Sequence, residues 1–202
     1  MKLFYMPGVC SLASHIALQE VGSPFEIEAV GRDKKTASGA DYMAINPKGA
    51  VPALLLDGGE VLTEGVAIMQ YVADSAGATA IAPPAGTLAR ARMQEAMNFI
   101  SGDLHKAYGP LFNPALTDEA RMAQKAVVAQ KLAQVERMLA DGRKYLTGDT
   151  YTLADGYVFV ITNWSKGQNI DLAPYPNLVA LRTRVAERPA VQAAMRAEGL
   201  LK

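Results

Sequence analysis

Apolar and polar residues follow two different patterns in the first eighty residues of the chain. Short apolar runs and one stretch of strict alternation predict strands, whereas apolar residues three to four apart predict helices. Asp57-Gly58-Gly59, between two of the runs, predicts a hairpin turn. The expected strands are residues 2–6, 25–30, 51–56 and 60–62, and the expected helices begin after Cys10, near residue 40 and near residue 66. We therefore predict the order βαβαββα.

After a segment rich in proline, alanine and glycine at residues 82–86, only helical patterns remain. Met93, Met97, Ile100 and Leu104 are spaced as one apolar helix face, and the same spacing recurs over residues 128–139. Further helices are expected at residues 152–164, 178–185 and 191–197. We predict an α/β domain over residues 1–80 and an all-helical domain over residues 87–202.

Composition and charge narrow the class of protein. The chain has 202 residues, of which 50% are hydrophobic, with 20 basic and 20 acidic side chains. This balance, without a basic cluster, argues against nucleic acid or a membrane surface as a partner. The apolar run before Pro7 is too short for the core of a secretory signal, and no stretch is long enough to span a membrane. A single cysteine excludes an internal disulfide framework, so we expect a cytoplasmic protein.

That cysteine, Cys10, follows the first predicted strand and opens the first predicted helix. A helix start carries unpaired N–H groups and a partial positive charge, and both can lower the pKa of a thiol to roughly 3.5–7.5. The alternative is a buried and unreactive cysteine, because free cysteines are usually buried. Position alone leaves both interpretations open.

Two further features near the predicted hairpin are unusual. Pro52 lies in an apolar run, although proline cannot donate to a strand ladder; it marks an edge, a strand start or a cis peptide after Val51. Thr63-Glu64-Gly65 precedes a helix. These residues could form an ordinary helix cap with an acid in the first turn. They could equally bind a zwitterion, with backbone N–H groups on its carboxylate and Glu64 on its ammonium.

A polar stripe runs along the predicted helix at residues 88–108. Asn98, Ser101, His105 and Tyr108 are three or four residues apart, so they share one helix face. Such a stripe is normally a solvated face, and this is the alternative to a site.

Two other polar features favour structural roles. Thr152 and Asp155, three residues apart ahead of an apolar run, predict a capping box rather than a catalytic carboxylate. His15 lies among small residues inside the first predicted helix, and this position is typical of a local structural hydrogen bond.

These segments together resemble a known family. Cys10-Ser11 after the first strand, residues 46–54 (NPKGAVPAL) and residues 62–68 (LTEGVAI) have the order and spacing found in cytosolic glutathione S-transferases. The helical half resembles the bacterial beta class, through Asn98, Leu104-His105-Lys106 and the Thr152–Asp155 pattern. The resemblance covers essentially the whole chain.

The resemblance implies a thioredoxin-like N-terminal domain with a cis Pro52, an all-helical C-terminal domain and a two-fold homodimer. It also implies a pocket for glutathione, a zwitterionic tripeptide. Val51 would pair with its cysteinyl part, Glu64 and Gly65 with its γ-glutamyl end and Lys35 with its glycyl carboxylate. Cys10, Asn98, His105 and Lys106 complete the glutathione-binding set, and Cys10, His105 and Ser11 are the implied catalytic residues. No metal is expected.

Other positions carry weaker expectations. Asp103 is five residues past Asn98, about 140° round an α-helix, so it is not expected to serve the same pocket. In the two-fold dimer that the resemblance implies, our hypothesis is that Asp103 reaches the ammonium of the partner's glutathione. Tyr108, Phe112 and Trp164 are candidates for an acceptor pocket, with a place in the core as the alternative. Tyr5 is expected mostly to pack. Gly65 replaces a serine of many relatives, and Met6 replaces a polar residue; both changes affect the pocket.

The leading interpretation is a bacterial beta-class glutathione S-transferase that joins glutathione thiolate to a small apolar electrophile, a detoxification reaction. An alternative is a glutathione-dependent redox enzyme (a thiol transferase, peroxidase or reductive dehalogenase) that cycles through a Cys10–glutathione disulfide. A third is a non-catalytic scaffold, which would have no need of the thiol, the polar stripe and the zwitterion site together.

Overall fold

The computed structural model describes residues 1–202, which form two compact units. The first unit comprises Met1–Thr79 and Glu187–Lys202, and the second comprises Ala80–Ala186. The C-terminal segment Glu187–Lys202 thus packs with the first unit, although it lies at the end of the range expected for the helical domain. No helix in either unit combines the length and the apolar character that a membrane span requires.

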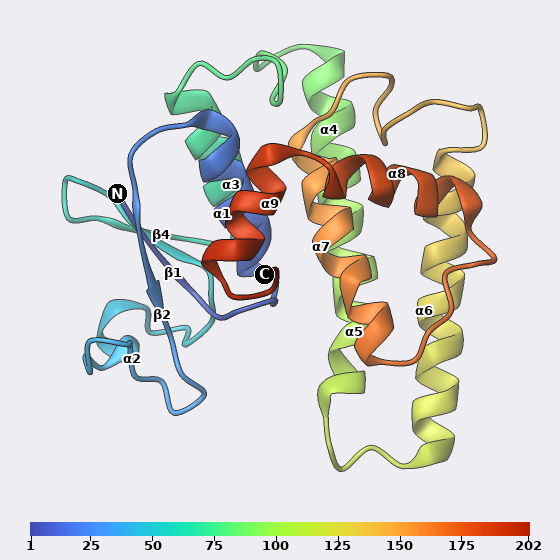
Figure 1. The fold of residues 1–202 in the computed structure, drawn as a ribbon, viewed down its shortest axis with the longest axis horizontal. Helices are drawn as coiled ribbons and strands as arrows, with labels where there is room; N and C mark the ends of the chain where they lie inside the picture. Colours follow the sequence, from blue (N-terminus) through green and yellow to red (C-terminus); the bar gives the residue numbers. More distant parts are fainter. The chain divides into compact units, whose positions relative to one another are not determined.

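The first unit is a four-stranded sheet with helices on both faces (Figure 1). Strands lie in the order β2-β1-β3-β4, with β1 and β2 parallel and the other pairs antiparallel. The elements are β1 Lys2–Tyr5, α1 Ser11–Val21, β2 Glu26–Ala29, α2 Tyr42–Ile45, β3 Ala53–Leu55, β4 Val61–Thr63, α3 Gly65–Ser75 and α9 Pro189–Ala197. The expected βαβαββα order and thioredoxin-like class are confirmed.

Alternation along β1 divides the core of this unit into two layers. Leu3 and Tyr5 point to the face where Leu18 of α1 and Ile68 of α3 pack. Phe4 points to the opposite face, beside Tyr42 of α2. The loop between β1 and α1, which carries Cys10, therefore emerges from a strand that is covered on both sides.

Helix α9 packs on α1 and ties the C-terminus to the first unit. Arg188 donates two hydrogen bonds to Glu20, at 2.6 and 2.8 Å. Further along, Glu198 Oε1 lies 2.9 Å from His15 Nδ1, and Glu198 Oε2 accepts the Gly8 N–H at 3.0 Å. The expected structural role of His15 is thus a long-range contact rather than a local one.

The second unit is entirely helical. It contains α4 Leu88–Phe99, a π-helical segment Ile100–His105, α5 Lys106–Tyr108, a 3-10 turn Gly109–Phe112, α6 Asp118–Met138, α7 Leu153–Gly167 and α8 Pro176–Ala186. The predicted apolar stripe from Met93 to Leu104 is buried throughout. The predicted capping box also forms, because Asp155 Oδ2 accepts the Thr152 N–H at 2.7 Å.

The expected continuous helix over residues 88–108 is replaced by α4, the π segment and α5. Hydrogen bonds in a π-helix reach five residues back instead of four, so each turn holds more residues. The 3.6-residue phase that placed Asp103 about 140° from Asn98 therefore does not hold across this segment.

Candidate functional site

Cys10 forms the N-cap of α1, where its thiol lies against the backbone of the segment before β3. Its Sγ donates a hydrogen bond to the Val51 carbonyl oxygen at 3.4 Å. Burial raises the pKa of this thiol to about 11 and outweighs the Cys10 and Ser11 N–H groups, which act in the opposite direction. Of the two interpretations that position left open, the direction of this pKa shift favours the buried cysteine, since desolvation exceeds the helix-start effect. At neutral pH Cys10 is a protonated hydrogen-bond donor.

The Val51-Pro52 peptide bond is cis, as the resemblance implies. The β3 ladder begins only at Ala53, so Val51 lies outside the pairing of the sheet. The preceding carbonyl, of Ala50, accepts two hydrogen bonds of 2.7 Å, from the Tyr42 hydroxyl and the Asn46 amide. Both donors belong to almost completely buried residues. The backbone at Val51 is consequently held in place without using its own N–H group.

Glu64 and Gly65 lie together where β4 passes into α3. Glu64 has φ 70° and makes no side-chain cap, so its carboxylate does not serve as an ordinary N-cap. A non-glycine residue in such a conformation costs of order 1–3 kcal/mol, which is typical of functional sites. Gly65 is the first residue of α3, and the first N–H groups of a helix have no partner within it.

Gly65 is also close to the cis proline. A Cβ atom placed on Gly65 would lie 3.6 Å from Pro52 Cγ. The thiol of Cys10, the free backbone of Val51 and the start of α3 are therefore neighbours within one unit.

Two other predicted residues of this unit differ in their surroundings. Lys35 is exposed on a loop that is tied down where Glu28 accepts hydrogen bonds from the Ser38 hydroxyl and N–H. Ser11 is completely buried, and its hydroxyl donates to the Met6 carbonyl and accepts the Met6 N–H, both at 3.2 Å. The predicted catalytic role of Ser11 is therefore disfavoured, because its hydroxyl is engaged inside the protein. Tyr5 packs in the core, as expected.

His105 ends the π-helical segment of the second unit. Its Nδ1 lies 3.2 Å from the Tyr157 hydroxyl, and its ring meets the Trp164 ring edge-on at 4.9 Å. Burial lowers the pKa of His105, so the imidazole is neutral at pH 7. A neutral imidazole can donate a hydrogen bond from one nitrogen while it accepts through the other.

The three candidates for an acceptor pocket are in contact through Trp164. Tyr108 and Phe112 meet the Trp164 ring at 5.8 and 5.2 Å. Tyr108 is fully buried, and its hydroxyl is hydrogen-bonded to Ser165 Oγ; burial raises its pKa to about 12. Tyr108 therefore belongs to the core, whereas Phe112, with 53% of its surface exposed, offers an apolar face to a ligand.

The remaining predicted residues lie on the surface of the second unit. Asn98 and Lys106 are exposed. Asp103 forms an ion pair of 2.6 Å with Lys131 of α6. No group of three or more His, Cys, Asp or Glu side chains is arranged to hold a metal ion.

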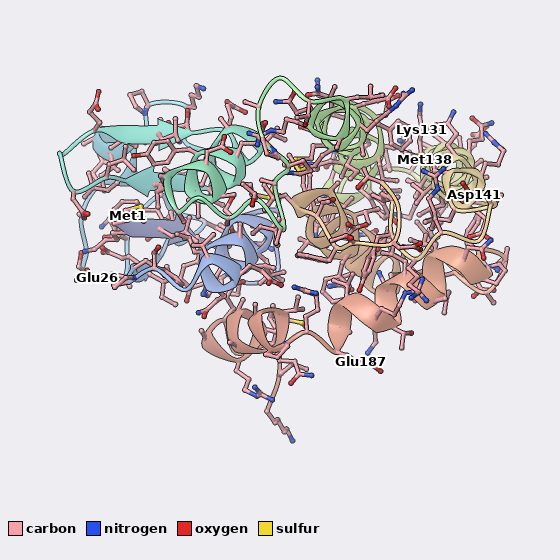
Figure 2. The ribbon with its side chains drawn as sticks, turned by 90° about the horizontal axis from the view of Figure 1, so that it is seen from above. Met1, Glu26, Lys131, Met138, Asp141 and Glu187 are labelled. Atoms are coloured by element: carbon pink, nitrogen blue, oxygen red, sulfur yellow. The ribbon has the colours of Figure 1, made fainter.

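A cavity of about 810 Å³ in the second unit contains none of the predicted residues. It is lined by residues of α4, by Met138 at the end of α6 and by Asp141 in the following loop, and Figure 2 labels the last two. Its arginines are largely paired with neighbouring acids, as in Arg143–Asp141 and Arg92–Glu95.

Four residues that hydrogen-bond to predicted residues, or to the Ala50 carbonyl beside Val51, escaped prediction: Tyr42, Asn46, Lys48 and Tyr157. Tyr157 could have been found, because it is seven residues from Trp164 and so shares its face of α7. Asn46 and Lys48 belong to a segment whose composition indicates only a turn. Nothing in the sequence pairs Tyr42 with the Ala50 carbonyl.

Comparison with known proteins gives matches along the whole chain. Residues 1–74 match the family model described as glutathione S-transferase, N-terminal domain, and residues 99–189 match its C-terminal domain counterpart. Glutathione S-transferase GstA of Escherichia coli O157:H7 is 45% identical over 99% of this chain and 100% of its own.

Two solved structures are similar over 99–100% of this chain and all of their own. One is a sphingomonad glutathione S-transferase complexed with glutathione, with 46% identity and a TM-score of 0.94. The other is the bacterial beta class glutathione S-transferase of Sphingomonas chungbukensis, with 44% identity and a TM-score of 0.95.

Proposed function

Because the chain belongs to the glutathione S-transferase family, in its bacterial beta class, and is a glutathione transferase, we propose how its own residues bind and use glutathione. The γ-glutamyl end binds at Glu64 and Gly65, the cysteinyl part pairs with the Val51 backbone, and Lys35 meets the glycyl carboxylate. The acceptor is a small apolar electrophile.

The observation that carries this proposal is the grouping, around Pro52, of polar groups that neither the strand ladder nor the helix uses. The Val51 backbone lies outside the sheet, the first N–H groups of α3 have no helical partner, and Glu64 presents a carboxylate that caps nothing. A tripeptide with a free backbone, a carboxylate and an ammonium is complementary to these three features.

The protonation state of Cys10 favours conjugation over redox cycling. An ordinary cysteinyl thiol has a pKa of about 8.5, whereas the pKa of Cys10 is raised to about 11. When both thiols face each other, the glutathione thiol ionises first and Cys10 keeps its proton. Cys10 then donates its S–H to the glutathione sulfur and stabilises the thiolate.

In the conjugation step the glutathione sulfur gives up its proton to solvent. Its electron pair then forms a carbon–sulfur bond to the electrophilic carbon, and the leaving group departs with the pair of the broken bond. We propose that His105, Asn98 and Lys106 complete the glutathione site from the helical domain. Neutral His105 would serve as a second donor to the sulfur.

A second candidate function is thiol–disulfide exchange. It is favoured by the contact of Cys10 Sγ with the Val51 carbonyl, beside which the ligand's sulfur is proposed to lie. Here the Cys10 thiolate would attack oxidised glutathione, form a mixed disulfide and release one glutathione thiolate. A pKa of about 11 leaves little thiolate at neutral pH, which weighs against this route.

The assembly and location are further parts of the proposal. We propose a homodimer in which Asp103 faces the partner's glutathione, and a detoxification role in the cytoplasm, where a single free cysteine suits a reducing environment.

Two variants of Cys10 separate the candidate functions. Conjugation to chlorodinitrobenzene and reduction of a glutathione mixed disulfide are measured for the wild type, Cys10→Ser and Cys10→Ala. Serine keeps a donor, so conjugation should fall only a few fold; alanine removes it, and the loss should be about tenfold or more. A redox enzyme would lose its activity in both variants and would form a one-glutathione adduct at Cys10, visible by intact mass. Absence of conjugation by the wild type would overturn the proposal.

A further inference from the structure

Lys48 places an ammonium group at the junction of β4 and α3. Its Nζ donates to Thr63 Oγ1 at 3.0 Å and to Glu64 Oε1 at 2.7 Å. An ammonium group has three N–H donors, so one remains available to a ligand. More than half of each side chain of the Lys48–Glu64 pair is exposed. The pair is therefore accessible from solvent.

The backbone of Lys48 is held in place by a hydrogen bond to the buried residue Asn46. The Lys48 N–H donates to Asn46 Oδ1 at 3.1 Å, while the amide of the same Asn46 donates to the Ala50 carbonyl. Asn46 is 2% exposed. The turn that carries Lys48 is thus tied to the peptide that positions Val51.

The charges of the Lys48–Glu64 pair are complementary to those of an amino-acid end group: a ligand carboxylate can face Lys48, and a ligand ammonium can face Glu64. A ligand ammonium can join Glu64 without displacing Lys48, because an ionised carboxylate has about four acceptor positions. A ligand carboxylate can join the free donor of Lys48 and the first N–H groups of α3. Gly65 has no side chain, so the helix start alone offers only backbone donors.

We propose that Lys48 is a specificity-determining residue that binds the α-carboxylate of the γ-glutamyl end and so selects zwitterionic end groups over simple amines. This assignment rests on the proposed binding of glutathione at Glu64 and Gly65. It differs from an ordinary exposed ion pair, which would leave ligand affinity unchanged.

The test combines one variant with one chemical change of the ligand. Calorimetric titration at low ionic strength compares glutathione with 4-aminobutanoyl-cysteinyl-glycine, which lacks only the α-carboxylate. Lys48→Met should weaken glutathione about tenfold or more, the size of a lost charge-assisted hydrogen bond. It should change the affinity for the analogue less than threefold, because the analogue has no group for Lys48 to bind.

Two further variants serve as controls. Lys2→Met also removes a lysine that pairs with carboxylates in this unit, Glu26 and Glu28, and should leave both affinities unchanged. Lys48→Arg keeps the charge and should restore most of the glutathione affinity.

Equal losses for both ligands, or no loss for either, would overturn the role of Lys48 while leaving the proposed function intact. A wild type that does not bind glutathione at all would overturn the proposed function itself.

Discussion

Replacing Glu198 by alanine tests whether the C-terminus supports the loop that precedes Cys10. The Glu198 carboxylate accepts from His15 Nδ1 and from the Gly8 N–H, at 2.9 and 3.0 Å. The side chains of His15 and Glu198 are 1% and 0% exposed. Leu200 also reaches this loop, since a Cβ atom placed on Gly8 would lie 3.4 Å from its Cδ2. Glu198→Ala removes one acceptor from two donors at once.

The cost follows from the burial of these groups. The loss of a hydrogen bond to a carboxylate typically costs about 1.5–3 kcal/mol, and Glu198 accepts two, so we expect a cost of about 3–6 kcal/mol. For a chain of 202 residues, about 1 kcal/mol lowers the melting temperature by roughly 2–4 °C. We therefore expect the melting temperature to decrease by about 6–24 °C. Glu198→Gln keeps one acceptor and should lose about half of this stability.

The assays are thermal unfolding, which gives the melting temperature, and urea unfolding, which gives the unfolding free energy, both at pH 7 and followed by far-UV circular dichroism. Glu20→Ala is the matched control, because the Glu20–Arg188 pair also joins α1 to the C-terminal segment. Arg188 is 28% exposed and stays solvated when Glu20 is removed, so we expect a cost of about 1–2 kcal/mol. A loss for Glu198→Ala no larger than that for Glu20→Ala would refute the reasoning.

Two further outcomes are expected. Tyr42→Phe removes one of the two donors to the Ala50 carbonyl and should lower the unfolding free energy by about 1 kcal/mol. It should also raise the KM for glutathione up to about fivefold, because the Ala50 peptide positions Val51. An unchanged KM in steady-state kinetics would contradict this positioning role. Burial raises the pKa of Asp155 to about 6, from about 3.8 when unfolded, so its stabilising contribution is present below pH about 3.8 and lost as pH rises through about 6. The unfolding free energy of the wild type, relative to Asp155→Asn, should thus fall by roughly 2.5 kcal/mol from pH 4 to pH 7; a constant difference would contradict this sign.

Patterns that are local in sequence predicted their structures well. The apolar run of β1, the Asp57-Gly58-Gly59 turn and the stripe from Met93 to Leu104 each depend on neighbours within a few residues. The same holds for the capping box at Thr152, whose two partners are three residues apart. Such features are determined by backbone geometry and solvent exposure, and both are visible in a short window of sequence.

Features that depend on distant residues were not predictable in this way. The direction of the pKa shift of Cys10 depends on how far other segments bury its thiol. One of them is the segment of Val51, 41 residues away, whose carbonyl accepts the hydrogen bond from the thiol. The packing of Glu198 on His15 joins positions 183 residues apart. The π-helical segment was likewise not predictable, because its apolar residues Ile100 and Leu104 are buried at the spacing of an ordinary α-helix.

The residues that break local rules are those from which we propose that the site is built. Pro52 interrupts an apolar run that otherwise predicts a strand, and Val51 lies outside the sheet ladder. Glu64 keeps a positive φ angle at some cost in stability, and its carboxylate is then free to pair with Lys48 rather than cap α3. His105 stands at the end of a π-helical segment, a form rare in proteins and frequent at functional sites. Each irregularity leaves a polar group unsatisfied by its own element, and it is this unsatisfied group that a ligand can bind.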